Sequence, residues 1–293
     1  KMIVYTQIFS EVISLTTLMA AFLGFVQGVA EFLPISSSGH LSLLQHFFGL
    51  EEVDNLFNIL LHFATLIAVC VVYWKDIVEM IVEFFRGIAA LFTRRGAREA
   101  NRPPEGRRLV LLVILATLPL ALVLPIDSEV EALGSSPVFV SVALIVTGFI
   151  LFFSDRMARG RKTARTATVT DALLVGLAQA LATVPGLSRS GCTISAGLLR
   201  GFDRKFAVRF SFLMSLPAVL GATLLKVVKT VKNGGIDTSL LPKYLLGMVI
   251  AGVVGYFSIR LVQLLADKGK FGRFAYYCWT AGAVALVSAL IFG

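Results

Sequence analysis

Polar residues gather within an otherwise apolar stretch near the beginning of the chain, and their types suit a bound phosphate. Gln27 and Glu31 are four residues apart, so a helix would place both side chains on one face. The run Ser-Ser-Ser-Gly-His at 36–40 follows and directly precedes a predicted helix at 41–48. The first turn of a helix offers free backbone N–H groups and a positive dipole end, so this run predicts an anion site.

A second polar turn lies in the apolar segment 170–200, where the sequence reads TVPGLSRSGC at 183–192. An arginine beside two serines at a helix start binds phosphate oxygens through charge-assisted hydrogen bonds. The alternative, an arginine that extends to the membrane interface, is less favoured in this company. The candidate residues of this turn are Ser188, Arg189, Ser190 and Thr193.

These two segments repeat each other at a constant offset of 152 residues. Six of the 18 aligned positions in 24–41 are identical. The identical pairs are Gly24 with Gly176, Gln27 with Gln179, Ala30 with Ala182, Ser36 with Ser188, Ser38 with Ser190 and Gly39 with Gly191. The positions of Ser37 and His40 hold Arg189 and Cys192 in the second copy. One half therefore supplies a carboxylate and an imidazole, and the other supplies a guanidinium.

Composition places the chain in a membrane. Of its 293 residues, 57% are apolar and 15% are charged, whereas soluble domains contain about 25% charged residues. Several apolar runs approach the roughly 20 residues that cross a bilayer. Six spanning helices are predicted, at 57–74, 109–124, 137–154, 205–230, 241–266 and 274–292.

Broken helices and loop charges together predict an inverted repeat. Segments 12–48 and 170–200 have Pro, Gly and serines in their middles, and such irregular backbone is tolerated at membrane depth only where protein buries it or it lines a cavity. The basic loops 94–108 and 156–168 mark the cytoplasmic side, and the acidic loop 125–136 marks the outer side. The two segments are therefore predicted to be re-entrant hairpins of opposite orientation, with a polar site near the midplane.

The predicted fold class is an all-α polytopic membrane protein with six transmembrane helices and two re-entrant helical hairpins in an inverted-topology repeat. We expect a single membrane domain over 1–293, with one half at about 12–93 and the other at about 170–266. The flanking helices are those at 109–124, 137–154 and 274–292. The segment 77–92 has its charged residues on one face, which favours an interfacial helix over a seventh span with buried charges.

The net charge of +9 has a topological explanation. The basic residues lie in short loops between apolar segments, and little soluble surface remains for a nucleic-acid footprint, so no nucleic-acid partner is expected. Other polar residues are interpreted structurally: His46 and His62 as packing or interface residues, and Asp155, Asp171 and Asp203 as helix caps or interface charges. The spacing of the three cysteines suggests neither a disulfide nor a metal site.

Glu31 is the strongest functional candidate, because an ionisable group at membrane depth is costly and usually functional. A carboxylate repels a phosphate unless a divalent cation lies between them. With Gln27 as a neutral oxygen ligand, Glu31 predicts Mg²⁺ or Ca²⁺, since no thiolate or histidine cluster favours zinc. Hydrolysis of a phosphoanhydride would use the whole set: a cation, an in-line nucleophile and an acid or base.

The motifs QGVAEFLPISSSGH at 27–40 and PGLSRSGCTI at 185–194 resemble the two signature regions of the undecaprenyl-diphosphate phosphatase family associated with bacitracin resistance. The resemblance covers essentially the whole chain. It implies metal-assisted conversion of the lipid diphosphate to the monophosphate on the outer face of the bacterial inner membrane, which recycles the carrier for peptidoglycan and other envelope polymers. The family's pattern admits Glu or Gln at position 27, and Gln27 cannot act as a base.

Carried over by position, the resemblance implies a site formed by Gln27, Glu31, Ser36, Ser37, Ser38, Gly39, His40, Ser188, Arg189 and Ser190, with Thr193 nearby. We expect Ser37 to attack the terminal phosphorus with His40 as general base; attack by His40 or by activated water are the alternatives. The rival function is a transporter or flippase of polyprenyl phosphate that uses the same midplane site. Membrane lipids surround the protein, and the sequence leaves a homodimer open.

Overall fold

The two segments of the sequence repeat each fold as a pair of helices separated by a break. The structure is a computed structural model that describes residues 15–47, 55–91, 103–232 and 238–292. In the first segment α2 (Thr17–Ala30) is followed by α3 (Ser37–Phe47), and in the second α10 (Val169–Leu181) is followed by α11 (Arg189–Leu199). Residues 17 and 169, and residues 37 and 189, are both 152 apart, so the helices begin at the offset of the sequence repeat.

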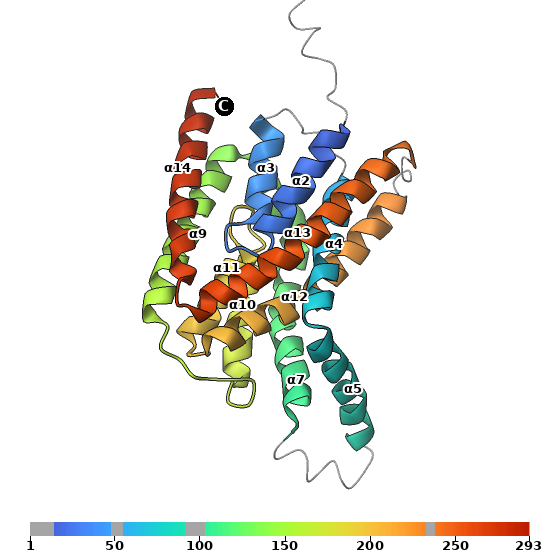
Figure 1. The fold of residues 1–293 in the computed structure, drawn as a ribbon, viewed down its shortest axis with the longest axis vertical. Helices are drawn as coiled ribbons and strands as arrows, with labels where there is room; N and C mark the ends of the chain where they lie inside the picture. Colours follow the sequence, from blue (N-terminus) through green and yellow to red (C-terminus); the bar gives the residue numbers. More distant parts are fainter. Residues whose placement is uncertain (1–14, 48–54, 92–102, 233–237, 293) are drawn as a thin grey trace, which may run out of the picture.

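The arrangement of these two pairs is visible in Figure 1. Helices α2 and α3 lie in the upper part of the view and α10 and α11 in the lower part, and the two breaks meet between them. Each pair begins at an equivalent threonine cap: Thr16 accepts from the Met19 N–H at 3.2 Å, and Thr168 accepts from the Asp171 N–H at 3.1 Å. These side chains satisfy backbone donors that the first helical turn would otherwise leave unpaired.

Within the described residues, five helical segments are long and apolar enough to cross a membrane, and the number rises to six if the bent pair α4–α5 is one span. The protein is a multi-pass membrane protein, and the predicted all-α polytopic fold class is confirmed. The other main helices are α4 (Asn55–Val72), α5 (Trp74–Leu91), α7 (Glu105–Thr117), α9 (Pro137–Met157), α12 (Arg204–Lys232), α13 (Leu241–Asp267) and α14 (Phe274–Phe292). The short elements are η1 (Leu118–Leu122), η2 (Leu124–Ile126), α8 (Asp127–Ala132), η3 (Leu133–Ser135), η4 (Thr238–Leu240) and η5 (Phe271–Arg273).

The span predicted at 109–124 is irregular in its second half. Helix α7 ends at Thr117, and the chain continues through the short 3₁₀ turns η1 and η2, each of which contains a proline. Pro119 and Pro125 cannot donate a backbone hydrogen bond, and each ring clashes with the preceding turn of an α-helix. The chain therefore loosens here, and this irregular stretch forms part of the cavity wall described below.

Helix α5 corresponds to the segment predicted at 77–92, and it is bent by 84° from α4. Of the three residues Glu79, Glu83 and Arg86 on its charged face, only Glu83 is buried, and it accepts from Arg107 of α7 at 3.1 Å and from Arg86 at 3.0 Å. Large apolar side chains such as Phe85 are exposed on its other side. The bend turns the axis of α5 away from that of α4. Its depth in the bilayer stays a prediction.

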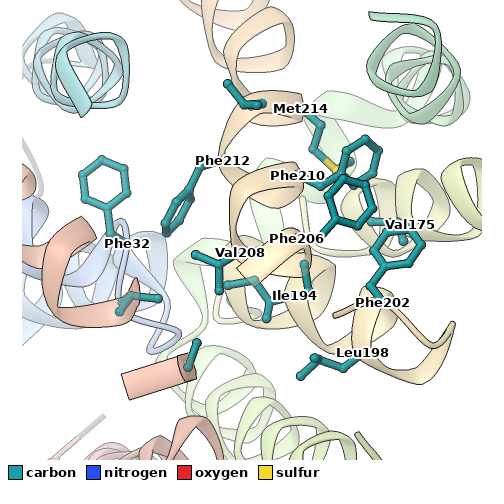
Figure 2. Packing of buried hydrophobic residues seen from close by; sticks show 14 of the residues in the cluster. Phe32, Val175, Ile194, Leu198, Phe202, Phe206, Val208, Phe210, Phe212 and Met214 are labelled. Carbon is teal, nitrogen blue, oxygen red and sulfur yellow. The ribbon is translucent and has the colours of Figure 1, made fainter. Parts of the chain in front are cut away.

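Aromatic packing beneath the breaks supports α11 and α12. Figure 2 shows Phe202, Phe206 and Phe210 clustered at the start of α12; their rings are tilted or edge to face, with centroids 4.8–5.8 Å apart. Phe32, at the first break, meets Phe212 edge to face at 5.5 Å. Edge-to-face pairs contribute about 0.5–1.5 kcal/mol beyond burial of their area. The first turn is thereby fixed to a helix of the second half.

The aspartates that the sequence suggested as caps are confirmed in that role at two of three positions. Asp171 caps α10 through Thr168 and also pairs with Lys162 at 2.8 Å and Arg200 at 2.9 Å. Asp203 accepts from two backbone N–H groups at the start of α12. Asp155 instead joins α9 to the turn before α14, where it accepts from Arg204 and from the Gly272 N–H.

Helices α2 and α13 cross with their backbones in contact. A Cβ at Gly24 would collide with the carbonyl group of Gly247, and a Cβ at Gly28 would lie 2.7 Å from the Ala251 carbonyl oxygen. Small residues four apart on facing helices are the usual means of close packing in membranes, where van der Waals contact replaces the hydrophobic effect between helices. This crossing fixes the helix that carries Gln27 and Glu31.

Replacing Gly24 with alanine should lower the melting temperature of the detergent-solubilised protein by several degrees, because overpacking against backbone costs about 1–3 kcal/mol. Gly252→Ala on α13 is the matched control, since its Cβ would lie 3.5 Å from the Ala64 carbonyl oxygen, an ordinary contact. Equal melting temperatures for the two variants would contradict the close crossing of α2 and α13.

Candidate active site

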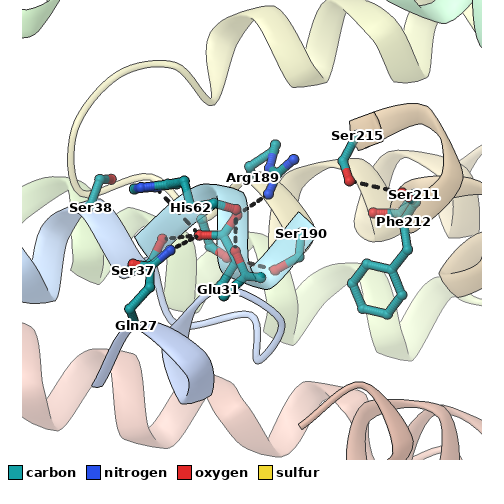
Figure 3. Close-up of polar contacts among 12 residues, drawn as sticks. Gln27, Glu31, Ser37, Ser38, His62, Arg189, Ser190, Ser211, Phe212 and Ser215 are labelled. Carbon is teal, nitrogen blue, oxygen red and sulfur yellow. Dashed lines mark hydrogen bonds and ion pairs between the residues drawn. The ribbon is translucent and has the colours of Figure 1, made fainter. Parts of the chain in front are cut away.

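Glu31 is the centre of the polar cluster between the two breaks. It lies at the end of α2 and is 6% exposed. Its Oε2 accepts from Gln27 Nε2 at 2.9 Å and from Ser37 Oγ at 2.7 Å, and its Oε1 pairs with the Arg189 guanidinium (Figure 3). The predicted convergence of the two halves is confirmed at this point, because the carboxylate comes from one half and the guanidinium from the other.

Equivalent turns position Ser37 and Arg189, each of which is the first residue of its helix. Ser36 and Ser188 precede them and accept from the N–H groups of Gly39 at 3.2 Å and Gly191 at 3.1 Å. Both helices, α3 and α11, therefore direct their N-terminal ends toward Glu31. The positive ends of two helix dipoles meet there, which favours an anion.

The first turn stores backbone strain that the second avoids. Ser36 has φ of 70°, a left-handed conformation that is unfavourable for any residue with a Cβ. In the second turn the positive φ, 92°, occurs at Gly186, where a Cβ would also lie 2.6 Å from the Val140 carbonyl oxygen. Strained residues of this kind persist when their surroundings over-determine them, and they concentrate at functional sites.

Hydrogen bonds between the turns lock them together. Ser36 Oγ donates to the Leu187 carbonyl at 3.2 Å, and Ser190 Oγ donates to the Leu33 carbonyl at 3.4 Å. A Cβ on Gly39 would lie 3.0 Å from the Gly186 Cα, so the two backbones pass in direct contact. Ser36, Gly39 and Ser190, which the sequence placed in the substrate site, thus hold the two turns in register.

A cavity of about 550 Å³ opens beside Glu31, within the size range of small-molecule sites. Its polar end is lined by Glu31, Ser37, Ser38, Asn58, His62, Ser188 and Arg189. Its apolar wall comes from η1, η2 and the middle of α12, including Leu120, Leu124 and Val219. Asp127 and Glu131 of α8 also contribute to the lining. Such a site has room for an anionic head group at one end and for an apolar chain along the wall.

Comparison with known proteins identifies the family of this chain. The family described as bacitracin resistance protein BacA matches residues 20–284 of the chain. The chain belongs to this family. It is 40% identical over 284 residues to the undecaprenyl-diphosphatase of Alkaliphilus metalliredigens (strain QYMF), covering 94% of this chain and 100% of that protein. It is similarly related to the undecaprenyl-diphosphatases of Halothermothrix orenii, at 37% identity with 92% and 97% covered, and Carboxydothermus hydrogenoformans, at 39% identity with 93% and 97% covered.

Five of the eleven predicted site residues of this BacA-family chain line the cavity, namely Glu31, Ser37, Ser38, Ser188 and Arg189. Gln27, Ser36, Gly39 and Ser190 lie behind this lining in the contacts described above, and Thr193 and His40 make other contacts. Thr193 is buried, donates to the Arg189 carbonyl at 2.8 Å and is 2.6 Å from Ser211 Oγ, so it joins α11 to α12. His40 was expected to act on Ser37. Its Nδ1 lies 2.8 Å from the Ser36 carbonyl oxygen and its Nε2 lies 2.7 Å from the Tyr277 hydroxyl.

The ring of His40 is therefore engaged on both sides, and it is not among the described residues that line the cavity. The bond to the Ser36 carbonyl, four residues back, turns the imidazole along α3 and toward α14. The hydrogen-bond acceptor of Ser37 is Glu31 instead. In this geometry His40 holds the serine turn to α14, and the carboxylate rather than the imidazole contacts the Ser37 hydroxyl.

His62 is the residue of this site that the sequence interpretation missed. Its Nε2 lies 3.6 Å from Glu31 Oε2, and its Nδ1 lies 2.8 Å from the Asn58 carbonyl oxygen. Both His62 and Asn58 line the cavity. A signal was present in the sequence: two polar residues four apart interrupt an otherwise apolar helix, and an ionisable residue at such a depth is usually functional.

The protein donors present form only a partial set for a divalent cation. Both oxygens of Glu31 already accept from protein donors, whereas Gln27 Oε1 is buried without a partner. The described part of the chain contains no group of three His, Cys, Asp or Glu residues that could hold a metal. A Mg²⁺ ion commonly uses one or two carboxylates together with substrate phosphates. The donors therefore fit an ion that arrives with a phosphate, and the expected Mg²⁺ or Ca²⁺ stays a prediction.

A double-mutant cycle tests the ion pair across the two halves. Glu31→Gln and Arg189→Gln should each destabilise the protein strongly, because loss of one partner leaves a buried charge uncompensated, at about 3–5 kcal/mol. The double variant should lose about 1–3 kcal/mol less than the sum. Unfolding in a denaturing detergent measures these values.

The exposed pair Lys205–Asp267, 3.5 Å apart, is the control and should show little coupling. Additive effects of Glu31→Gln and Arg189→Gln would mean that the two residues do not interact.

Proposed function

We propose that this protein is an undecaprenyl-diphosphatase, which hydrolyses undecaprenyl diphosphate to undecaprenyl phosphate and inorganic phosphate. The activity recycles the lipid carrier for peptidoglycan and other envelope polymers and confers resistance to bacitracin. The observation that carries the proposal is the Ser37 hydroxyl, bonded to a buried carboxylate at the end of a cavity that also contains Arg189. The names of the relatives support it.

The diphosphate would bind at the polar end of the cavity. Arg189 and the N-terminal N–H groups of α3 and α11 offer positive charge and donors to its oxygens. The prenyl chain would follow the apolar wall of η1, η2 and α12 toward lipid. Most of the substrate's apolar surface then stays out of water, and only the head group enters the polar site.

Chemistry would begin with attack of Ser37 Oγ on the terminal phosphorus. The Ser37 proton passes to Glu31 Oε2, its hydrogen-bond acceptor at 2.7 Å, while the bridging P–O bond breaks. The proton then moves to the departing undecaprenyl phosphate, which leaves Glu31 ionised. Water next attacks the phosphoserine, gives its proton to Glu31 and releases inorganic phosphate. That proton returns to Ser37 Oγ and restores the hydroxyl.

Substrate binding would itself activate Glu31. In the free protein Arg189 neutralises this carboxylate. When phosphate oxygens take over the guanidinium, the Glu31 carboxylate is released from its ion pair and is free to accept the Ser37 proton. His62, whose Nε2 is 3.6 Å from Glu31 Oε2, lies beside this carboxylate in the cavity lining. Arg189 meanwhile offsets the charge of the equatorial oxygens in the transition state.

A divalent cation would be held by Glu31 and Gln27 Oε1 together with phosphate oxygens. Mg²⁺ or Ca²⁺ bound there supplies further charge neutralisation for the phosphates. None of the proton transfers described above passes through it.

The cavity would open to the outer side of the bacterial inner membrane. Asp127 and Glu131, which line it, belong to the acidic loop without basic residues at 125–136. The basic loops, such as 156–168, are retained on the cytoplasmic side. The positive-inside rule thus supports an outward-facing site.

Ser37→Ala should abolish phosphate release from a short-chain prenyl diphosphate in detergent, because no hydroxyl remains to attack. Ser38→Ala is the matched control: this serine lines the same cavity, yet it makes no hydrogen bond to Glu31 in the described structure, so its loss should cost only about 5–10-fold. If Ser37→Ala released phosphate at the wild-type rate, the nucleophile would be another group. A wild-type protein that releases none would favour the rival carrier function.

Removal of divalent cations should suppress phosphate release, because the charge of the diphosphate beside Glu31 would be less fully neutralised. The wild-type protein is assayed with excess chelator, then with Mg²⁺ or Ca²⁺ added beyond the chelator. Recovery with either ion is expected. Full activity in chelator would remove the metal from the proposed site.

A further inference from the structure

Gln179 is a buried side chain that the chemistry above does not use. It lies on α10, is 1% exposed and lines the cavity beside Arg189. Neither its Nε2 nor its Oε1 has a hydrogen-bond partner in the described structure. An unpaired buried amide costs about 1–3 kcal/mol. A leucine of similar size would avoid this cost. We therefore expect the amide to bind a ligand that is absent from the free protein.

The repeat explains how this amide lost its partner. Gln27, the equivalent residue in the first half, donates to Glu31 at 2.9 Å. The residue 152 positions after Glu31 is Thr183, whose hydroxyl donates to the Ala180 carbonyl at 2.8 Å. The second half therefore keeps the glutamine but lacks the carboxylate. An acceptor that replaces that carboxylate must come from the cavity.

The surroundings of Gln179 indicate which acceptor fits. Arg189 also has an unpartnered buried donor, Nη1, so two residues that line the same cavity have unsatisfied donors. Anionic oxygens of a phosphate satisfy such donors, whereas an apolar chain does not. Helix α10 packs against η1, which is part of the apolar wall. Gln179 thus belongs to a helix that also contacts the apolar wall, along which the prenyl chain is proposed to lie.

We propose that Gln179 binds the lipid-linked phosphate of the substrate through its Nε2. Ser37 acts on the terminal phosphate from the first half, while the amide of the second half holds the phosphate that remains on the lipid. The inference rests on the proposed function for the identity of the ligand. It also predicts that the product, a prenyl monophosphate, uses the same contact and that inorganic phosphate does not.

Gln179→Leu tests the contact without leaving a cavity. Loss of one hydrogen bond to a charged group should raise KM for a short-chain prenyl diphosphate about tenfold, with kcat little changed. The inhibition constant of prenyl monophosphate should rise by the same factor, and that of inorganic phosphate should stay the same. The melting temperature should be equal or higher, since an unpaired buried amide is removed.

Gln263→Leu is the control. Gln263 on α13 donates to the Tyr73 hydroxyl at 2.8 Å, and it is not among the described residues that line the cavity. Its loss should lower the melting temperature and leave KM and both inhibition constants unchanged. This pattern is the opposite of that expected for Gln179→Leu, so a structural glutamine and a ligand-binding one are told apart.

Unchanged inhibition by prenyl monophosphate in Gln179→Leu would overturn the inference, as would an equal loss of affinity for inorganic phosphate. Direct binding of a fluorescent prenyl monophosphate to both variants separates this result from failure of the proposed function. If the wild type releases no phosphate but binding weakens only in Gln179→Leu, the contact holds and the hydrolase does not. If the wild type releases phosphate and Gln179→Leu binds the prenyl monophosphate as tightly as the wild type does, the hydrolase holds and the contact does not.

Discussion

The ion pair between Glu31 and Arg189 is the interaction on which the site depends. Neither charge is tolerated alone at the depth of a membrane interior, because desolvation of an unpaired ion costs several kcal/mol. Each half of the repeat contributes one partner, so the site exists only when both broken helices are in place. The interlocked turns, the aromatic contact of Phe32 with Phe212 and the glycine crossing of α2 on α13 all serve to hold these two groups together.

The two halves of the repeat share the backbone features that position the site and differ in the side chains placed there. Both halves retain a threonine cap, a serine that directly precedes the second helix and a glycine three residues after that serine. The first helical position became Ser37 in one half and Arg189 in the other. The two equivalent helix starts thus carry a hydroxyl and a guanidinium, and both groups contact the Glu31 carboxylate.

The sequence was sufficient to predict the repeat, the broken helices and the meeting of Glu31 with Arg189, because these follow from local periodicity and loop charge. Side-chain direction was not predictable in the same way. His40 turns to Tyr277, 237 residues away, and His62 reaches Glu31 only through the packing of α4. The unpaired state of Gln179 likewise depends on what surrounds it and not on its own position in the repeat.

The carboxylates of Asp127 and Glu131 in the cavity lining would repel anions that approach the proposed site from water, but not a substrate that approaches from the lipid. A water-soluble phosphoanhydride, such as a nucleotide, would come from the aqueous side and meet negative charge, which lowers its local concentration. Under the proposed function, a lipid-anchored diphosphate would instead enter along the apolar wall of η1 and α12, with its tail in the bilayer. The enzyme could thereby ignore abundant soluble competitors without a pocket that recognises the length of the prenyl tail.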